Sequence, residues 1–214
     1  IRRANFNYIY GVIYNSGNLT ARGCIFKNNT GYYDSMPAFK GSPNIYNIGN
    51  LNITYSAFMD NNEFVGIASD VYFNGGEIIT LDNNWWNTNE NPCSLDAKIN
   101  VDGINSWLIF NLAPDYSKLN ISDSITLKAS WTNNIDLLPN INLMPVFNVT
   151  FKTEVNGKEI IENKQLSGGS CEFTFDHTQN KGSYDVVASL FSFNQSAIVD
   201  VGKTLSYVRY SMAE

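Results

Sequence analysis

Three stretches within the first ninety residues share one pattern of hydrophobic and polar positions. Residues 13–19 and 45–51 differ at one position only, and residues 72–78 repeat the pattern more loosely. A large aromatic residue follows each stretch at the same distance, and one more stands a repeat earlier. These aromatics are Phe6, Phe26, Phe58 and Trp85. Their spacings of 20, 32 and 27 residues predict a basic repeat of 20 residues with two insertions.

Within each repeat, apolar and polar residues alternate as they do along a β-strand. Leu19, Ala21 and Gly23 are separated by polar residues, and residues 51–55 alternate in the same way. A single repeat cannot bury its apolar row, whereas stacked repeats bury one row against the next. The pattern therefore predicts a parallel β-solenoid of about four coils, with the four aromatics stacked inside it.

Recurring polar positions predict the corners of each coil. An amide recurs at the end of the first strand, at Asn15, Asn47 and Asn74. Amides stacked in this way bond to one another and form a ladder. A glycine recurs two residues later, at Gly17, Gly49 and Gly76. A tight corner at this place is expected to need positive φ, which glycine adopts at no steric cost.

From residue 107 the pattern changes to short alternating strands separated by turn signals. We predict seven strands, at residues 107–112, 124–131, 146–155, 158–163, 171–175, 183–190 and 196–201. Asn156 and Gly157 suit a two-residue type I′ turn, because both tolerate positive φ. Trp131 and Tyr184 are expected in the core or at a tyrosine corner. Seven strands in fewer than a hundred residues predict an antiparallel immunoglobulin-like sandwich.

The two patterns divide the chain into domains. We expect β-helix coils over residues 1–92, a linker over 93–106, the sandwich over 107–202 and a tail over 203–214. The last coil needs a cap, and Trp85 with Trp86 stands where the cap is required. An aromatic platform for sugars is the alternative role of this pair. Because the chain starts within a coil, we expect it to belong to a longer protein.

Composition favours an extracellular location for these domains. Charged residues make up 16% of the 214 residues and the net charge is −6, which argues against nucleic acid or an anionic membrane as partner. Asparagine accounts for 31 residues and aromatic residues for 14%, which is typical of a polar, β-rich extracellular surface. No apolar run is long enough to span a bilayer, so no membrane insertion of this chain is expected.

The three cysteines show no spacing that would hold a metal ion. We expect free thiols, with Cys24 as a small buried hydrophobic residue. A bridge between Cys93 and Cys171 is the alternative.

Three features of the chain together resemble one family. They are the asparagine- and glycine-rich repeats, the closing segment 83–89 with its tryptophan pair, and the strand that opens at Trp107. This arrangement resembles the adhesin-like surface proteins of methanogenic archaea over nearly the whole chain. The resemblance implies a right-handed parallel β-helix followed by a bacterial-immunoglobulin-like domain, and parallel crossovers favour the same hand. Family members commonly carry glycine after the tryptophan pair, where this chain has Asn87. Asparagine also accepts left-handed geometry.

The acidic residues of the predicted coils form no catalytic pair. By the coil alignment, Asp60 shares a column with Asn28 and Asn87. Asp82 shares another with Gly23 and Tyr55. Glycosidases need two facing carboxylates, and lyases of this fold need clustered carboxylates beside a basic residue.

The basic residues and the single histidine offer no catalytic pattern either. The alignment predicts no ladder among Arg2, Arg3, Arg22, Lys27 and Lys40. His177 lies on a predicted turn of the second domain, where an exposed histidine is the simpler interpretation. We therefore predict no enzymatic activity, no metal and no cofactor.

Binding is the better-supported function. Two insertions, at residues 30–43 and 62–71, project from the same side of neighbouring coils, where repeat proteins often bind their ligands. The first insertion supplies the candidate ligand-binding residues Tyr32, Tyr33, Phe39 and Lys40. Alternatively, this loop folds its aromatics over an exposed coil edge.

Three hypotheses about function follow from the sequence. The first is a non-enzymatic cell-surface adhesion module that binds glycans or proteins of a partner cell. The second is a structural stalk or spacer of a surface protein. The third is a polysaccharide-processing β-helix whose site lies in coils outside this chain.

Overall fold

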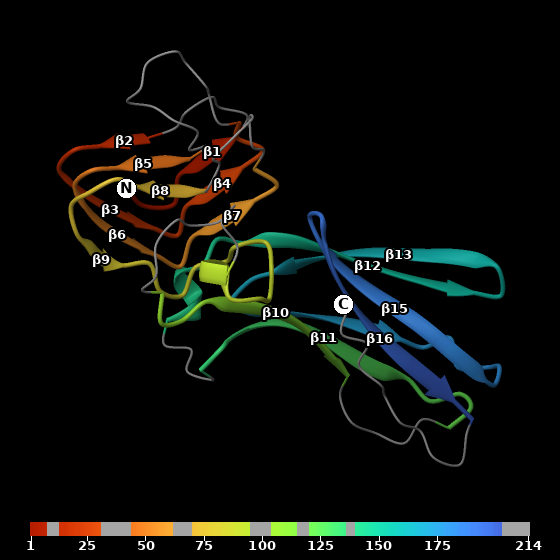
Figure 1. The fold of residues 1–214 in the computed structure, drawn as a ribbon. Coiled ribbons are helices and arrows are strands. Elements are labelled where there is room, and N and C mark those ends of the chain that lie inside the picture. Colours follow the sequence, from red (N-terminus) through yellow and green to blue (C-terminus); the bar gives the residue numbers. More distant parts are fainter. Residues whose placement is uncertain are drawn as a thin grey trace. The chain divides into compact units, whose positions relative to one another are not determined.

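The computed structural model describes residues 1–7, 13–30, 44–61, 70–94, 104–114, 120–135 and 140–202. Its regular elements are β-strands, with two short 3-10 turns, η1 (Pro92–Ser94) and η2 (Ile141–Leu143). The chain forms two compact units (Figure 1). The first unit comprises residues 1–109 and 132–145, and the second comprises residues 110–131 and 146–214. The predicted domain boundaries stay a prediction.

The first unit contains three parallel sheets of three short strands each (Figure 1). One sheet consists of β1 (Asn5–Asn7), β4 (Ile25–Lys27) and β7 (Ala57–Met59). The next consists of β2 (Ile13–Asn15), β5 (Ile45–Asn47) and β8 (Val71–Phe73). The third consists of β3 (Asn18–Arg22), β6 (Asn50–Thr54) and β9 (Ile78–Thr80). Successive repeats of the sequence therefore supply successive strands of each sheet.

The first two spacings of the sequence repeat are confirmed by the strand registers. Phe6 pairs with Phe26, and Phe26 pairs with Phe58. Leu19 likewise pairs with Leu51. The 20-residue and 32-residue offsets both hold because an insertion between β4 and β5 leaves the strand order unchanged.

The third repeat is shifted by one residue from the predicted alignment at β8. Tyr46 pairs with Tyr72 and Asn47 with Phe73, so Asn74 is not a rung of the amide ladder. The ladder has two rungs, in which Asn15 Nδ2 donates to Asn47 Oδ1 over 2.5 Å. The Asn74 backbone N–H donates to the Asn47 carbonyl at 2.8 Å instead. Strand β8 therefore lies one residue earlier in the chain than predicted, and one extra residue in the corner before β9 restores the predicted pairing of Leu51 with Ile78.

A β-bulge then moves the end of the third repeat in the other direction. Leu51 pairs with Ile78, but Asn52 pairs with Thr80, so β9 has one extra residue between these two pairs. As a result Ala57 faces Trp85, and the ring of Trp86 lies on Phe58 at 4.5 Å. The prediction that Trp85 continues the aromatic stack was wrong, because the bulge brings Trp86 into that place.

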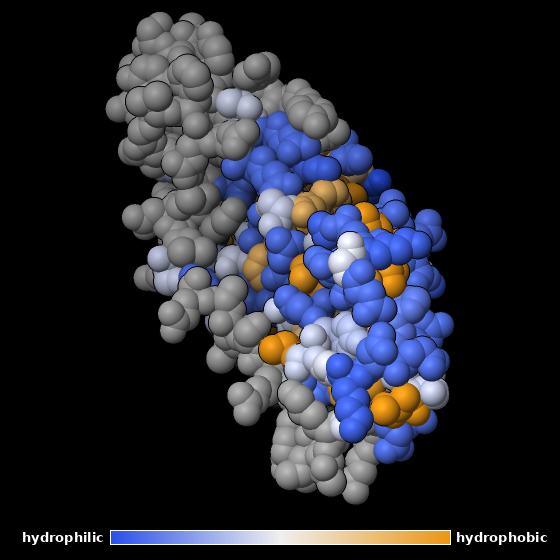
Figure 2. Space-filling view, turned by 90° about the vertical axis from the view of Figure 1, so that its right-hand side faces the viewer, coloured by the Kyte–Doolittle hydropathy of each residue, from blue (hydrophilic) through white to orange (hydrophobic). Residues whose placement is uncertain are grey.

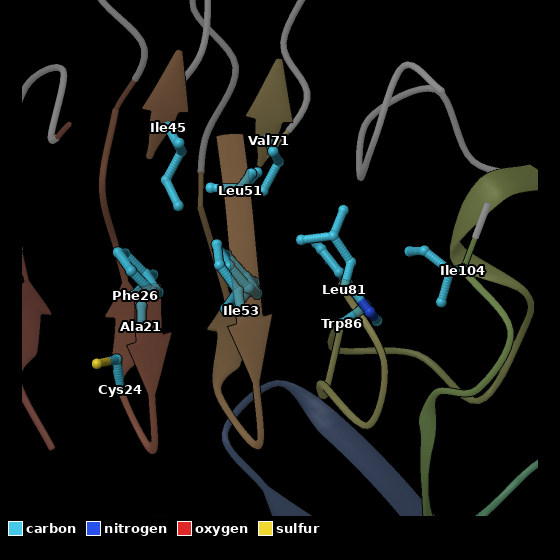
Figure 3. Packing of buried hydrophobic residues seen from close by; sticks show 11 residues of the cluster. Ala21, Cys24, Phe26, Ile45, Leu51, Ile53, Val71, Leu81, Trp86 and Ile104 are labelled. Atoms are coloured by element: carbon cyan, nitrogen blue, oxygen red, sulfur yellow. The ribbon is translucent and has the colours of Figure 1, made fainter. Parts of the chain in front are cut away.

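The resulting stack forms the centre of the first unit's core. Phe6 and Phe26 are 4.9 Å apart between ring centroids, and Phe26 and Phe58 are 4.7 Å apart. These values match the distance between neighbouring strands of a sheet, so each repeat contributes one ring. Figure 3 shows the aliphatic side chains that line the same interior, among them Leu51 and Ile53.

The glycine column has a different cause from the predicted one. Gly17 and Gly49 do not have positive φ, and only Gly76 does, at 84°. A Cβ on Gly49 would lie 2.1 Å from the Gly17 carbonyl oxygen, and one on Gly76 would lie 2.2 Å from that of Gly49. Glycine is required because the backbones of successive repeats approach each other too closely for a side chain.

Residues 104–108 continue the first unit after the tryptophan pair. Trp107 forms a parallel bridge with Asn84, and Leu108 N–H donates to the Asn84 carbonyl at 3.0 Å. Ile104 is buried in the same hydrophobic cluster as Trp86. This segment therefore covers the last rung, and both Trp85 and Trp86 lie fully buried beneath it.

The second unit consists of two sheets that contain all seven predicted strands. One sheet has the order β10 (Leu108–Pro114), β11 (Ile125–Asn133), β14 (Ser170–Phe175). The other has the order β13 (Lys158–Leu166), β12 (Phe147–Val155), β15 (Gly182–Leu190), β16 (Phe193–Val201). The registers of β11 with β14, β12 with β13 and β15, and β15 with β16 are antiparallel. Parallel sheets followed by antiparallel ones confirm the all-β class.

Both aromatic residues selected in the second half occupy the expected kinds of place. Trp131 is buried and packs edge-on against Phe110 and Phe147. The Tyr184 hydroxyl donates to the carbonyl of Asn180, four residues upstream, at 3.1 Å. That backward hydrogen bond is the defining contact of a tyrosine corner.

Two tight hairpins organise the larger sheet. Val155 pairs with Lys158 across Asn156 and Gly157, whose φ values of 54° and 73° confirm the predicted type I′ turn. Leu190 pairs with Phe193 across a second two-residue turn that the sequence did not indicate. Its first residue, Phe191, has φ of 56°, a conformation that large side chains rarely adopt. Strand β16 consequently begins three residues before the predicted start at residue 196.

Candidate functional site

The four ligand-binding residues predicted from the sequence lie outside the described residues. Tyr32, Tyr33, Phe39 and Lys40 all belong to the first insertion, between residues 31 and 43. Most of the second insertion, residues 62–69, is likewise outside the described part. The ends of both insertions are described, and they carry a distinctive set of polar residues.

A hydrogen bond between two side chains closes the base of each insertion, buried at the first and partly buried at the second. Asn29 Nδ2 donates to Asn44 Oδ1 at 2.7 Å across the first insertion. Asn61 Nδ2 donates to Asp70 Oδ1 at 2.8 Å across the second. Asn29, Asn44 and Asp70 are at most 1% exposed. Buried polar groups need such partners, so each pair fixes the two ends of its loop at one place.

Two further hydrogen bonds join the two loop bases to each other. Asn44 Nδ2 donates to Asp70 Oδ1 at 2.8 Å, and the backbone N–H of Asn29 donates to Asn61 Oδ1 at 3.0 Å. We call these four residues the amide square. It holds the described ends of both insertions at the same corner, immediately before β5 and β8.

A row of tyrosines runs along the outside of the sheet that begins at this corner. Tyr14, Tyr46 and Tyr72 occupy matching positions of β2, β5 and β8. Their ring centroids are 5.7 and 5.5 Å apart, and their planes differ by 12° and 26°. We call these residues the tyrosine row. The sequence repeat already placed Tyr14 beside Tyr46, but the shifted third repeat concealed Tyr72.

The tyrosine row is accessible and carries polar groups. Tyr14 is 49% exposed, and Tyr46 and Tyr72 are half-buried. The Tyr46 hydroxyl lies 2.5 Å from Asn74 Nδ2, which donates to it. Tyrosine combines an apolar ring with a polar tip, and amides and hydroxyls complement the hydroxyl groups of sugars. The row is therefore suited to weak contact with a polar chain that lies along the sheet.

The prediction that the basic residues form no ladder was wrong for one pair. Arg2 and Arg22 form a parallel bridge, so they do stack, contrary to the absence of a ladder predicted from the alignment. The 20-residue offset that pairs Phe6 with Phe26 also pairs these arginines. Together with Arg3 and Leu143 they line a hollow of about 210 Å³.

One of the two columns predicted for the acidic residues is confirmed. Asn28, Asp60 and Asn87 all have left-handed φ between 49° and 58°, and Asn87 Nδ2 donates to Asp60 Oδ1 at 3.2 Å. The predicted place of Asp82 beside Tyr55 is wrong. Tyr55 N–H donates to the Asn83 carbonyl at 3.1 Å, because the bulge in β9 shifts the chain by one residue.

Few groups in the described part of the chain resemble a catalytic or metal centre. Among the described residues, no three histidine, cysteine or acidic side chains lie together where they could hold a metal ion. His177 is exposed, and its Nε2 lies 3.4 Å from Asp176. The cysteines are free thiols, as expected, with Cys24 fully buried.

Two further findings concern the polarity of the outer surface and the similarity of the chain to known proteins. On the face seen in Figure 2, the described residues are mainly hydrophilic, with hydrophobic residues in small separate patches. No described helix has the length and apolar character to cross a membrane. No model of a protein family matches the chain, and a search of the curated proteins found no significant match.

Proposed function

We propose that the chain is a non-enzymatic, extracellular cell-surface adhesion module that binds glycans of a partner cell. The observation that carries the proposal is the partly exposed tyrosine row on a sheet of stacked repeats. The amide square joins Asn29 and Asn44, the described ends of the first insertion, immediately before β5 of the same sheet, which supports the proposal. Tyr32, Tyr33, Phe39 and Lys40 stay predicted contacts within that surface.

In this proposal the first unit is the end of a right-handed parallel β-helix. Three parallel sheets whose strands succeed one another at repeat offsets support the helix. The hand is taken from the preference of parallel crossovers and from the resemblance to archaeal adhesin-like proteins.

The second unit is proposed to be an immunoglobulin-like sandwich. The first, second and fifth strands share one sheet, and the third, fourth, sixth and seventh share the other. This division is that of sandwiches in which the fourth strand pairs with the third. Such a domain would serve as a spacer for the first unit.

The proposal is tested by glycan binding of the intact chain and of two surface variants. The chain would be immobilised and exposed to a glycan array and to whole microbial cells, as wild type, as Tyr14→Ala/Tyr46→Ala and as Tyr33→Ala/Phe39→Ala. We expect weak wild-type affinity, about micromolar to millimolar, with strength coming from many copies on a surface. Each variant should bind about tenfold less tightly, because aromatic contacts dominate shallow sites.

A control variant distinguishes glycan binding at this surface from nonspecific binding to exposed hydrophobic residues. Val146 and Ile161 are each 55% exposed and belong to the second unit, so Val146→Ala/Ile161→Ala should bind as the wild type does. Absence of glycan and cell binding by the wild type would favour a purely structural spacer. Depolymerisation of a polysaccharide by the wild type would contradict the non-enzymatic part of the proposal.

A further inference from the structure

Three arginines gather at one end of the outer face of the β3–β6 sheet. Arg2 and Arg22 are paired in parallel, and the backbone holds this register through Arg3 N–H to the Arg22 carbonyl at 3.0 Å. Both side chains are exposed, and like charges directly opposite each other on neighbouring strands are destabilising. No ion pair between described residues offsets this repulsion.

The arginines and Leu143 line a shallow hollow. Arg3 has a left-handed φ of 49°, which marks a corner immediately after Arg2. A Cβ on Gly23 would lie 2.6 Å from the Leu143 carbonyl oxygen and 3.5 Å from Arg3 Cγ, so glycine allows these groups to approach. The hollow of about 210 Å³ is the volume of about seven waters, enough for a sulfate or carboxylate group.

The positive charge of this hollow is not neutralised within the described part of the chain. The ion pairs found there involve Lys152, Lys164 and His177, and none involves an arginine. Asp82 follows β9 and is already engaged, since its Oδ1 accepts from the backbone N–H groups of Asn105 and Ser106 at 2.9 and 3.1 Å. The net charge of the protein is −6, so three arginines that no described carboxylate pairs with are a local exception.

The surface beside the hollow has the chemistry of a sugar-binding strip. Outward positions of β3 carry Asn18 and Thr20 before Arg22, and those of β6 carry amides and a hydroxyl. Asn50 Nδ2 donates to Asn18 Oδ1 at 2.9 Å, so these amides already form one row. Arginine binds carboxylate and sulfate through two parallel hydrogen bonds, which a lysine cannot reproduce.

We propose that the hollow lined by Arg2, Arg3 and Arg22 is the subsite for the sulfate or carboxylate group of an acidic glycan. The sugar chain would lie along the outer face of β3 and β6, with its hydroxyls on the amide row. This inference rests on the proposed glycan-binding function and gives it a ligand class.

The test measures the affinity of the full chain for four probes by isothermal titration calorimetry. The probes are a heparin hexasaccharide, a galacturonate hexamer, a neutral cellohexaose and a single-stranded DNA of the same charge as the heparin probe. We expect the Arg2→Gln/Arg22→Gln variant to bind the sulfated or the carboxylated sugar at least tenfold less tightly. Its affinity for the neutral sugar should be unchanged.

Two further variants test whether the loss of affinity is specific to the arginines of the hollow. Lys128→Gln/Lys181→Gln removes the same charge from exposed lysines of the second unit and should change acidic-sugar affinity less than twofold. Arg22→Lys keeps the charge but loses the paired hydrogen bonds, and it should fall between wild type and the double variant. Equal losses in the lysine and arginine variants would show a general charge effect and overturn the subsite.

The failure of this inference is distinguishable from the failure of the proposed function. A wild type that binds neutral but not acidic sugars overturns the subsite and leaves the adhesion proposal standing. A wild type that binds none of the sugars overturns both. DNA binding as tight as heparin binding would overturn the assignment to an acidic glycan.

Discussion

Left-handed backbone conformations recur at matching corners of the repeats. One column contains Arg3, Gly23, Tyr55 and Asn83, with φ between 49° and 63°. Another contains Asn28, Asp60 and Asn87. Glycine, asparagine and aspartate accept this geometry more readily than other residues do. Much of the asparagine content is thus explained by corners and buried amide contacts, which the sequence alone could not separate from surface polarity.

The glycine column gives a sharp prediction at this scale. Gly49→Ala should lower the free energy of unfolding by more than about 3 kcal/mol, since its Cβ would lie 2.1 Å from the Gly17 carbonyl oxygen. Gly17→Ala is the matched control, because a Cβ there meets nothing within 4 Å and its φ is not left-handed. Its effect should stay within about 1 kcal/mol in urea unfolding. Similar losses in both variants would contradict the close stacking of the repeats.

Cys171 gives a pH dependence whose sign follows from its burial. Burial raises the pKa of this thiol to about 11, from 9.0 in the unfolded chain. The unfolded state therefore loses its proton first, and the stability that Cys171 contributes is constant below pH 9 and falls as the pH rises from 9 to 11. Urea unfolding of wild type and Cys171→Ala at pH 8 and pH 10.5 should show the larger loss for wild type. Equal losses would show that the thiol titrates freely in the folded protein.

At the scale of elements, predictability depended on whether the repeat was intact. The nearly identical stretches 13–19 and 45–51 determined the registers of β2 with β5 and of β3 with β6. The third stretch failed because β8 pairs one residue earlier than predicted, whereas the residues after the bulge in β9 pair one residue later. Such shifts leave the hydrophobic pattern almost unchanged, so the pattern could not select Trp86 over Trp85.

The candidate site was predictable only in part for the same reason. The tyrosine row could be expected from the pairing of Tyr14 with Tyr46. The amide square could not be predicted, because its members are separated by insertions of different lengths. The arginine pair required the 20-residue offset to be extended to the first residues of the chain, where the pattern contains only half a repeat.

The hairpin between β12 and β13 tests the turn chemistry of the second unit. Replacing Asn156 and Gly157 by alanine should destabilise the unit by about 1–3 kcal/mol, since alanine resists the positive φ that both positions adopt. Asn156→Gly is the control and should be tolerated, because glycine adopts this conformation freely. Thermal unfolding of the three proteins provides the measurement. An unchanged melting temperature in the double alanine variant would contradict the type I′ turn.

At the scale of the whole molecule, stacking the repeats produces a core and a surface together. Inward positions of β1, β4 and β7 form the aromatic stack. Outward positions of the other two sheets form the tyrosine row, on β2, β5 and β8, and the amide row, on β3 and β6. Each outward row repeats at the strand spacing, which gives a periodic polar surface. A surface of this kind suits an extended, repetitive ligand such as a polysaccharide better than a compact one.

The most direct test of the account is to map where a glycan touches the intact chain. Amide chemical-shift perturbation by NMR would be recorded with the tightest-binding sugar from the array. The account predicts shifts concentrated at Tyr14, Tyr46 and Tyr72 and along β3 and β6, with residues 146–201 unaffected. Shifts concentrated at residues 146–201, or spread evenly over both units, would contradict the claim that the stacked repeats form the binding surface.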